Sequence, residues 1–187
     1  AENFLVAIGD SIVILVPKTN EVKASDDGQW RVALHWVTDN GTDFGLYYVN
    51  AHNKAPAYQL FCSPIGLPEN YEIQYYEDIQ GYAASFTTVL GNTNIQGEIS
   101  YKTDVPVVDL EGDPEEGDLI SAQLGGSLVL EPTVLWDDAN LTFELATAQI
   151  DSHDGDELRY DDHATAVFLR LELAYLNVLS GLDIKVP

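Results

Sequence analysis

Cysteine is almost absent from this chain of 187 residues. Cys62 is the only one, so no disulfide can form within the chain. Because a free cysteine is among the most frequently buried residue types, we expect Cys62 to be a small buried apolar residue. A disulfide to a second molecule is the alternative.

Basic residues are also scarce, since 8 Lys and Arg stand against 31 Asp and Glu, for a formal net charge of -23. No basic cluster is available to replace phosphate counterions, which argues against nucleic acid as a direct partner and against adhesion to anionic lipid. Between Asp104 and Asp162 there are 17 acids and one basic residue, Arg159. Acids scattered through a well-patterned chain favour adaptation to multi-molar salt over an ordinary solvated acidic surface.

The chain has no apolar run that reaches the length of a membrane span. The segment from Phe4 to Val16 is apolar but is interrupted by Gly9, Asp10 and Ser11, and no basic residue precedes it, so it is not typical of a signal peptide. Hydrophobic residues still make up 45% of the chain and aromatic residues 10%, which is enough for a core. The length suits one domain of residues 1–187.

The longest apolar segment, from Ala164 to Leu179, has the period of a β-strand. Arg170 and Glu172 fall between apolar residues at every second position, which predicts a long strand with one buried face. These apolar residues are Val167, Leu169, Leu171, Leu173 and Tyr175. A helix is the alternative, because a stripe of helical spacing also runs through Val167, Leu171, Ala174 and Val178.

The same alternation from Trp30 to Trp36 predicts a half-buried strand, and Asn40-Gly41 predicts a tight turn into a hairpin that ends at Tyr48. Both tryptophans alternate in step with aliphatic residues, so we expect them in the core. An aromatic platform for sugar is the alternative, formed by the two tryptophans with Tyr47, Tyr48, Tyr71, Tyr75, Tyr76 and Tyr82.

Turn signals recur along the rest of the chain about every ten residues. The acidic segment from Glu111 to Asp118 contains two Gly and one Pro and is expected to be an irregular connection. Gly125-Gly126 is expected to separate two short strands, and Thr133 to Trp136 to form another. The pattern predicts an all-β fold, a single jelly roll or β-sandwich barrel with long acidic loops.

No catalytic or cofactor-binding signature is present, so we expect neither an enzyme nor a cofactor. The two acidic loops contain weak candidates for cation binding, because hard cations prefer several carboxylate oxygens. These candidates are Asp109, Asp113, Glu116, Asp151, Asp154 and Asp156. Their spacing does not fit a calcium loop of the EF-hand type, and no metal site is therefore expected. His153 and His163 flank the second loop and could approach one another, but we expect ordinary surface histidines paired with nearby Asp.

The chain resembles a known family in three features. These are the β alternation from Phe4 through Leu169-Arg-Leu-Glu-Leu173, the scarcity of Lys and Arg, and the acidic loops at Asp109 to Asp118 and Asp151 to Asp162. This family is the smaller major capsid protein of halophilic archaeal icosahedral viruses with an internal membrane. The resemblance implies a virion protein with a single upright jelly roll. Its partners would be further copies of itself, a larger companion capsid protein and neighbouring capsomers, in a shell over a membrane that the chain does not span.

Two other classes of function remain open. A β-sandwich module from a halophile would bind carbohydrate through a solvent-facing aromatic cluster. A small halophilic hydrolase would need two carboxylates that converge in a cleft, one of them with a raised pKa.

The charge balance leads to a first prediction. Assembly of this chain should weaken when salt is withdrawn, because the subunits repel one another when their carboxylates are not screened. Light scattering coupled to size-exclusion chromatography, from low salt to several molar, would measure this together with circular dichroism. Assemblies that remain intact after dialysis to low ionic strength would contradict it.

Overall fold

The computed structural model describes residues 3–8, 12–153 and 157–186, and these residues form β-strands, turns and loops without a helix. The strands belong to two sheets of different size. The small sheet has the order β1-β2-β6-β5, and β2 and β6 run parallel in it. Its strands are β1 (Asn3–Ile8), β2 (Ile12–Val22), β5 (Ala57–Cys62) and β6 (Pro68–Gln74).

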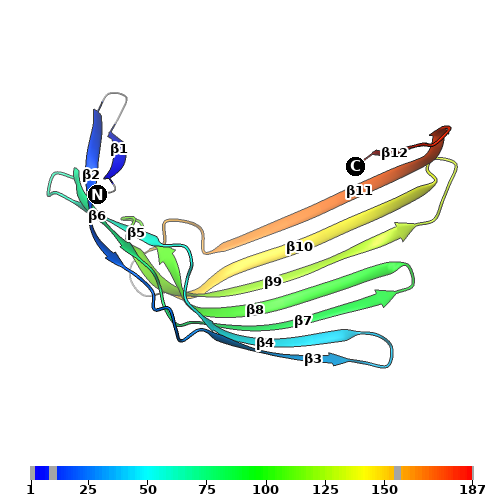
Figure 1. The fold of residues 1–187 in the computed structure, drawn as a ribbon, viewed down its shortest axis with the longest axis horizontal. Coiled ribbons are helices and arrows are strands. Elements are labelled where there is room, and N and C mark those ends of the chain that lie inside the picture. Colours follow the sequence, from blue (N-terminus) through cyan, green and yellow to red (C-terminus); the bar gives the residue numbers. More distant parts are fainter. Residues whose placement is uncertain (1–2, 9–11, 154–156, 187) are drawn as a thin grey trace.

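The large sheet contains eight strands in the order β12-β11-β10-β9-β8-β7-β4-β3, and all its neighbours are antiparallel. Apart from the excursion into β5 and β6, each strand pairs with the next one in the chain, as Figure 1 shows. The strands are β3 (Trp30–Val37), β4 (Asp43–Ala51), β7 (Ile79–Leu90), β8 (Thr93–Val108), β9 (Pro114–Leu130), β10 (Asp138–His153), β11 (His163–Leu179) and β12 (Leu182–Val186).

Tight turns join several of these strands. The predicted hairpin is confirmed, since β3 pairs with β4 from Trp30 opposite Asn50 to Val37 opposite Asp43. Gly41 in its turn has a φ of 80°, a conformation that glycine adopts without steric cost. Gly91, between β7 and β8, has a φ of 63° for the same reason.

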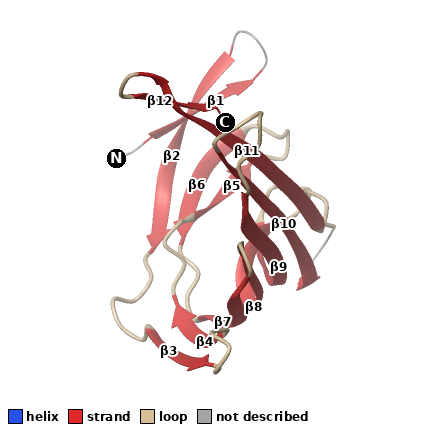
Figure 2. Cartoon of the chain, turned by 90° about the vertical axis from the view of Figure 1, so that its right-hand side faces the viewer, coloured by secondary structure: helices blue, strands red, loops and turns tan. Residues whose placement is uncertain are grey.

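The two sheets do not form a common core among the described residues. Figure 1 places the small sheet at one end of the large sheet and not across its face, and Figure 2 shows the large sheet as a single curved layer. β5 and β9 lie in contact where the two sheets meet. Among residues 15–153 and 157–186, few apolar side chains are buried, namely Val16, Pro68, Tyr71, Tyr76, Ala139 and Ala174.

The all-β class is confirmed, and the jelly-roll arrangement is not. A jelly roll is built from Greek keys, which place strands that are distant in sequence beside one another, whereas the large sheet runs in sequential order. The predicted strand from Ala164 to Leu179 is confirmed as β11, so the helical alternative is wrong. The expectation of a buried face is also wrong, because Val167 and Leu169 are 77% and 69% exposed.

Four local predictions are wrong, and the length of β9 corrects two of them. The strand begins at Pro114, inside the acidic segment that was expected to be irregular, and continues through Gly125-Gly126 without a break. Pairing with β8 and β10 on both sides holds these residues in the strand against their low propensity. The segment from Thr133 to Trp136 lies in the loop after β9 and is not a strand, and Cys62 is exposed instead of buried.

Glycine in this sheet makes room for aromatic rings of neighbouring strands. A Cβ on Gly126 would lie 2.8 Å from Cζ of Phe143 and 2.5 Å from the carbonyl oxygen of Asn94. A Cβ on Gly97 would lie 2.5 Å from Cε1 of Phe86. The rings of Phe143 and Phe86 therefore lie over backbone that only glycine leaves uncovered.

The substitution Gly126→Ala should destabilise the protein by about 1–3 kcal/mol, because the new methyl group must displace both a ring and a backbone carbonyl. Gly125→Ala is the matched control, since the nearest atom to its Cβ would be the carbonyl oxygen of Phe143 at 3.2 Å. Denaturant unfolding of both variants measures the difference. Equal stabilities of the two variants would disprove this account of the glycine pair.

Candidate functional site

The large sheet has two chemically different faces, because residues opposite one another on paired strands point to the same side. One row of pairs runs from Val32 through Tyr48, Tyr82 and Tyr101 to Ile120, across five strands. A second row begins at Trp36 and contains Phe44, Phe86, Gly97, Leu124, Leu145 and Val167. Both rows lie on the same face, since Val32 and Trp36 are four residues apart in β3.

We call this side of the sheet the apolar face. From the Val32 row to the turns that follow Trp36, Leu90 and Leu130, the positions on this face in the seven strands from β3 to β11 of the large sheet include no Asp, Glu, Lys or Arg, although the chain has 39 such residues, the sum of 31 acids and 8 bases. Exposed members of the face include Trp30, Val32, Leu34, Trp36, Phe44, Leu46, Tyr82, Leu90, Ile99, Leu124, Leu145, Val167, Leu169 and Leu171. A surface of this extent on a protein marks an interaction site, since isolated proteins rarely expose apolar patches of more than a few hundred Å².

The aromatic rings on the apolar face contact one another along the rows. The rings of Trp30 and Tyr48 have centroids 4.9 Å apart, as do those of Tyr48 and Tyr82, and Trp36 lies 5.9 Å from Phe44. The prediction that both tryptophans lie in the core is wrong, because Trp30 is 52% and Trp36 66% exposed. The alternation had identified the face correctly, but no second layer of described residues covers it.

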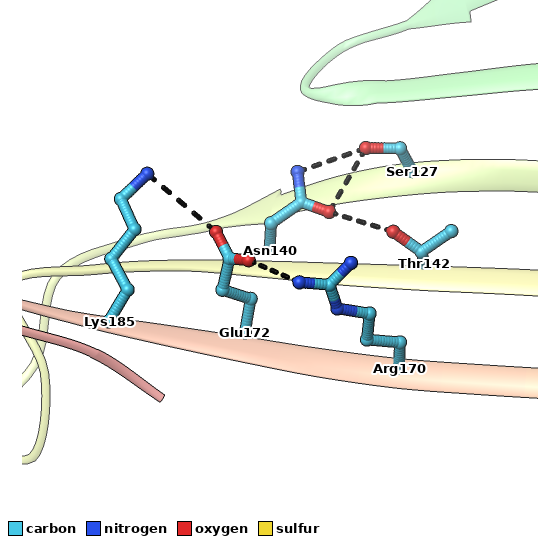
Figure 3. A network of polar contacts seen from close by, with 6 residues as sticks. All are labelled: Ser127, Asn140, Thr142, Arg170, Glu172 and Lys185. Atoms are coloured by element: carbon cyan, nitrogen blue, oxygen red, sulfur yellow. Dashed lines mark hydrogen bonds and ion pairs between the residues drawn. The ribbon is translucent and has the colours of Figure 1, made fainter. Parts of the chain in front are cut away.

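The opposite side, which we call the polar face, contains most of the hydrogen-bonding side chains of the long strands. In Figure 3, Asn140 on β10 donates through Nδ2 to Oγ of Ser127 on β9 at 3.0 Å, and Thr142 donates to Oδ1 of Asn140 at 3.2 Å. Arg170 donates to Glu172 at 2.6 Å, and the same carboxylate lies 3.7 Å from the ammonium of Lys185. Charged residues of β11 and β12 therefore satisfy one another on this side.

Asp109, one of the cation candidates of the first acidic loop, has structural partners. Asp109 is buried, and its Oδ1 accepts hydrogen bonds from the backbone N–H groups of Gly112 at 2.8 Å and Asp113 at 2.7 Å. This carboxylate thus closes the turn between β8 and β9. Glu116 lies in β9 opposite Pro106.

The second acidic loop is described in part. Asp151 lies in β10, at the point where the pairing with β9 is irregular, and Asp154 and Asp156 lie outside the described residues. Within residues 3–8, 12–153 and 157–186, no three Asp, Glu, His or Cys side chains are grouped so that they could hold a metal ion. His163 lies opposite Gln149 in the pairing of β11 with β10, so the pairing does not place it beside His153. Nδ1 of His163 lies 3.1 Å from Oδ1 of its neighbour Asp162.

A buried histidine that the sequence pattern did not indicate joins three loops at the end of the sheet. Nε2 of His52 lies 2.8 Å from the carbonyl oxygen of Asp27, and the N–H of Asp78 donates to Nδ1 at 3.1 Å. These partners require the neutral ring with its proton on Nε2. The histidine has a structural role, and only the contact between distant segments reveals it.

Tyr101 is the last aromatic residue in the row from Val32 to Ile120, and it forms a charge-assisted hydrogen bond. Its hydroxyl donates to Oδ2 of Asp118 at 2.6 Å, and Ser152 donates to the same oxygen at 3.0 Å. The hydrogen bond to Asp118, together with burial, raises the pKa of Tyr101 to about 12. In turn, the hydrogen bond from Tyr101 holds the pKa of Asp118 below its ordinary value against the opposing effect of burial.

This pair predicts how stability depends on pH. Folding lowers the pKa of Asp118, so the ionised carboxylate contributes to the free energy of unfolding above pH 3.8. This contribution is lost as the pH falls below that value. Folding raises the pKa of Tyr101 from 10.0 to about 12, so the neutral phenol contributes to the free energy of unfolding below pH 10.0. This contribution is lost as the pH rises through about 12. Tyr101→Phe should therefore lower the unfolding midpoint most at neutral pH and least at either extreme.

Denaturant unfolding at about pH 3, pH 7 and pH 11.5 measures the difference between the wild type and Tyr101→Phe. Tyr82→Phe is the control for the acid range, since the hydroxyl of Tyr82 donates to the uncharged amide of Gln80 at 2.9 Å. A difference for Tyr101→Phe that is the same at all three values would contradict the assigned pair.

Comparisons with known proteins place the chain in a family without assigning it an activity. Among the described residues, no helix is long and apolar enough to cross a membrane. No curated protein and no solved structure matches the chain. The resemblance to capsid proteins therefore stays a prediction. One family model matches residues 3–187, and the chain belongs to that family, which is described as "Protein of unknown function (DUF1302)".

Proposed function

We propose that this chain is a structural protein of a membrane, in which the apolar face of the large sheet lies against lipid hydrocarbon. The observation that carries the proposal is the apolar face itself, which crosses seven strands without a formal charge and is not covered by another layer of described residues. Transfer of one such aliphatic or aromatic side chain from water to an apolar phase gains about 1.5–3 kcal/mol. Each exposed aliphatic or aromatic side chain of the apolar face adds a gain of this kind.

The length of the apolar stretches supports this proposal. On β9 the apolar face extends from Ile120 to Leu130, which is 11 residues, and on β10 from Ala139 to Thr147, which is 9 residues. A tilted β-strand needs about 9–11 residues to cross the hydrocarbon core of a bilayer. The antiparallel ladder also satisfies the backbone groups of each inner strand, as hydrocarbon requires.

The placement of polar and aromatic groups supports it further. Tyr48, Tyr82 and Tyr101 occupy one row near the end of the sheet that holds the acidic loops. Tyrosine is enriched at the boundary between hydrocarbon and water, because its ring is apolar and its hydroxyl needs a partner. Contact through hydrocarbon is also compatible with the net charge of -23, which disfavours attraction to anionic headgroups.

The substitution Leu169→Arg should weaken insertion into zwitterionic phosphatidylcholine vesicles by about 2–4 kcal/mol, because it places a charge on the lipid-facing side of β11. Quenching of tryptophan fluorescence by brominated acyl chains measures insertion, since Trp30 and Trp36 lie on the same face. The wild type should be quenched, and Leu169→Arg should be quenched less at the same lipid concentration.

Phe168→Arg is the matched control for this experiment. Phe168 is adjacent in β11 and 51% exposed, but it lies on the polar face opposite Glu144. Its replacement by Arg should leave the quenching unchanged. Wild-type tryptophans that brominated chains do not quench, or equal effects of the two substitutions, would overturn the proposal.

A capsid role is the second candidate, and the uncovered apolar face favours it too, because subunits of a shell bury such surfaces against one another. The chain would then assemble with itself and with a larger companion capsid protein over an internal membrane. This candidate expects large assemblies in high salt without lipid. Sedimentation of lipid-free protein separates the two roles, since a lipid-facing sheet should instead aggregate without a defined size.

A further inference from the structure

The chain passes between the small sheet and the large sheet three times. The first crossing, residues 23–29, leads from β2 to β3, the second, residues 52–56, leads from β4 to β5, and the third, residues 75–78, leads from β6 to β7. Apart from these crossings, β5 and β9 lie in contact where the sheets meet. The position of the small sheet on the large sheet therefore depends on how the three crossings are held together.

His52 is the first residue of the second crossing, and its ring binds the other two crossings. The residue is buried, with 8% of its surface exposed. Its Nε2–H donates to the carbonyl oxygen of Asp27 on the first crossing at 2.8 Å. On the third crossing, the N–H of Asp78 donates to Nδ1 at 3.1 Å. One imidazole thus joins all three segments at a single point.

Other hydrogen bonds at this junction come from amides, which do not titrate. The N–H of Asn53 donates to the carbonyl oxygen of Tyr76 at 2.8 Å and joins the second crossing to the third. Nδ2 of Asn50, at the end of β4, donates to the carbonyl oxygen of Gly28 at 3.2 Å and to Oδ1 of Asp78 at 3.0 Å. These bonds limit how far the crossings can separate when the histidine ring changes charge.

Protonation of the imidazole removes one of its two hydrogen bonds. With its proton on Nε2, the neutral ring has a lone pair on Nδ1 that accepts the N–H of Asp78. When Nδ1 takes up a proton from water, it becomes a donor, and two N–H groups then face one another. The bond from Nε2 to Asp27 is retained, because this nitrogen donates in both states. The loss therefore falls on the third crossing alone.

The charged groups around His52 carry both signs. The carboxylates of Asp27, Glu77 and Asp78 accept hydrogen bonds from Ser25 or Asn50. A pH response of the junction must therefore be assigned by changing the histidine while these groups stay in place. The two hollows beside the ring are lined by further titratable residues, namely Glu21, Lys23, Asp26, Lys54 and Tyr75 in one and Lys102 in the other.

We propose that His52 is a pH-dependent latch between the two sheets. The neutral ring ties the third crossing to the other two, and protonation of Nδ1 releases that crossing and loosens the small sheet against the large sheet. Histidine is suited to this role because it is the side chain that changes charge between about pH 5 and pH 8. The latch does not depend on the proposed function, since it concerns the junction of the sheets and not the apolar face.

Hydrogen–deuterium exchange of the full chain in detergent micelles, followed by NMR, tests the hydrogen bond that protonation breaks. After correction for the intrinsic exchange rate, protection of the Asp78 N–H should fall about tenfold between about pH 7.5 and about pH 5, which corresponds to the loss of one intramolecular hydrogen bond. The N–H of Gly41 is the control, because it donates to the carbonyl oxygen of Thr38 at 2.9 Å in the turn after β3. Its protection should not change.

His52→Gln separates the histidine from the neighbouring carboxylates, because an amide offers a donor and an acceptor but does not titrate. Pulsed electron paramagnetic resonance measures the distance between spin labels on Cys62 in β5 and on Thr87→Cys in β7, both exposed positions. The distance distribution should broaden at about pH 5 in the parent protein and stay narrow in His52→Gln. His35→Gln is the matched control, since the exposed ring of His35 lies beside Asp43 within the first hairpin, and it should broaden like the parent.

Protection of the Asp78 N–H that is the same at both pH values would overturn the proposal, and this measurement decides it even if His52→Gln does not fold. A broadening that His52→Gln retains would also overturn it, because the neighbouring carboxylates would then cause the change. Both measurements are made without a bilayer. Failure of brominated lipid to quench Trp30 and Trp36 would therefore count against the proposed function and not against the latch.

Discussion

The period-two alternation of the β-strand is the constraint on which the rest of this structure depends. From β3 to β11 each strand is paired so that apolar residues fall into common rows, and a slip of one residue in any pair would bring charged side chains onto the apolar face. The register is continuous across the pair β7–β8, and across the pair β9–β10 from Ala139 to Ile150. Separation of the two faces is therefore a property of the whole sheet and not of any single strand.

This separation explains why an acidic chain contains such an extended apolar surface. The carboxylates of the long strands lie on the polar face, at the turns or near the strand ends, where Glu172, Asp109 and Asp118 have partners. The aromatic and aliphatic residues lie on the other face, where rings cover glycine backbone, as Phe143 does at Gly126. The small sheet lies at one end of the large sheet and not across its apolar face, so this surface is open to an apolar partner.

Sequence patterns predicted the strands well where alternation is long and regular. β11 and the hairpin of β3 and β4 followed from alternation and from Asn40-Gly41. The prediction of a break at Gly125-Gly126 was wrong. The low strand propensity of glycine favours a break, but hydrogen-bonded pairing of β9 with β8 and β10 keeps these residues in the strand. Alternation likewise cannot distinguish a face packed on protein from one that faces another apolar phase, which is why Trp30 and Trp36 were expected in a core.

The sequence by itself determined the all-β class, the positions of the main strands and the division of residues into an apolar and a polar set, since these depend on local spacing. Tertiary structure decided that eight strands follow one another in the large sheet and that His52 joins distant loops. It also decided that, among the described residues, no second layer covers the apolar set and no strand pairs with the outer edge of β11 from His163 to Glu172. These features depend on which strands become neighbours. Strand order is set by contacts between residues far apart in the chain, and local periodicity contains no information about them.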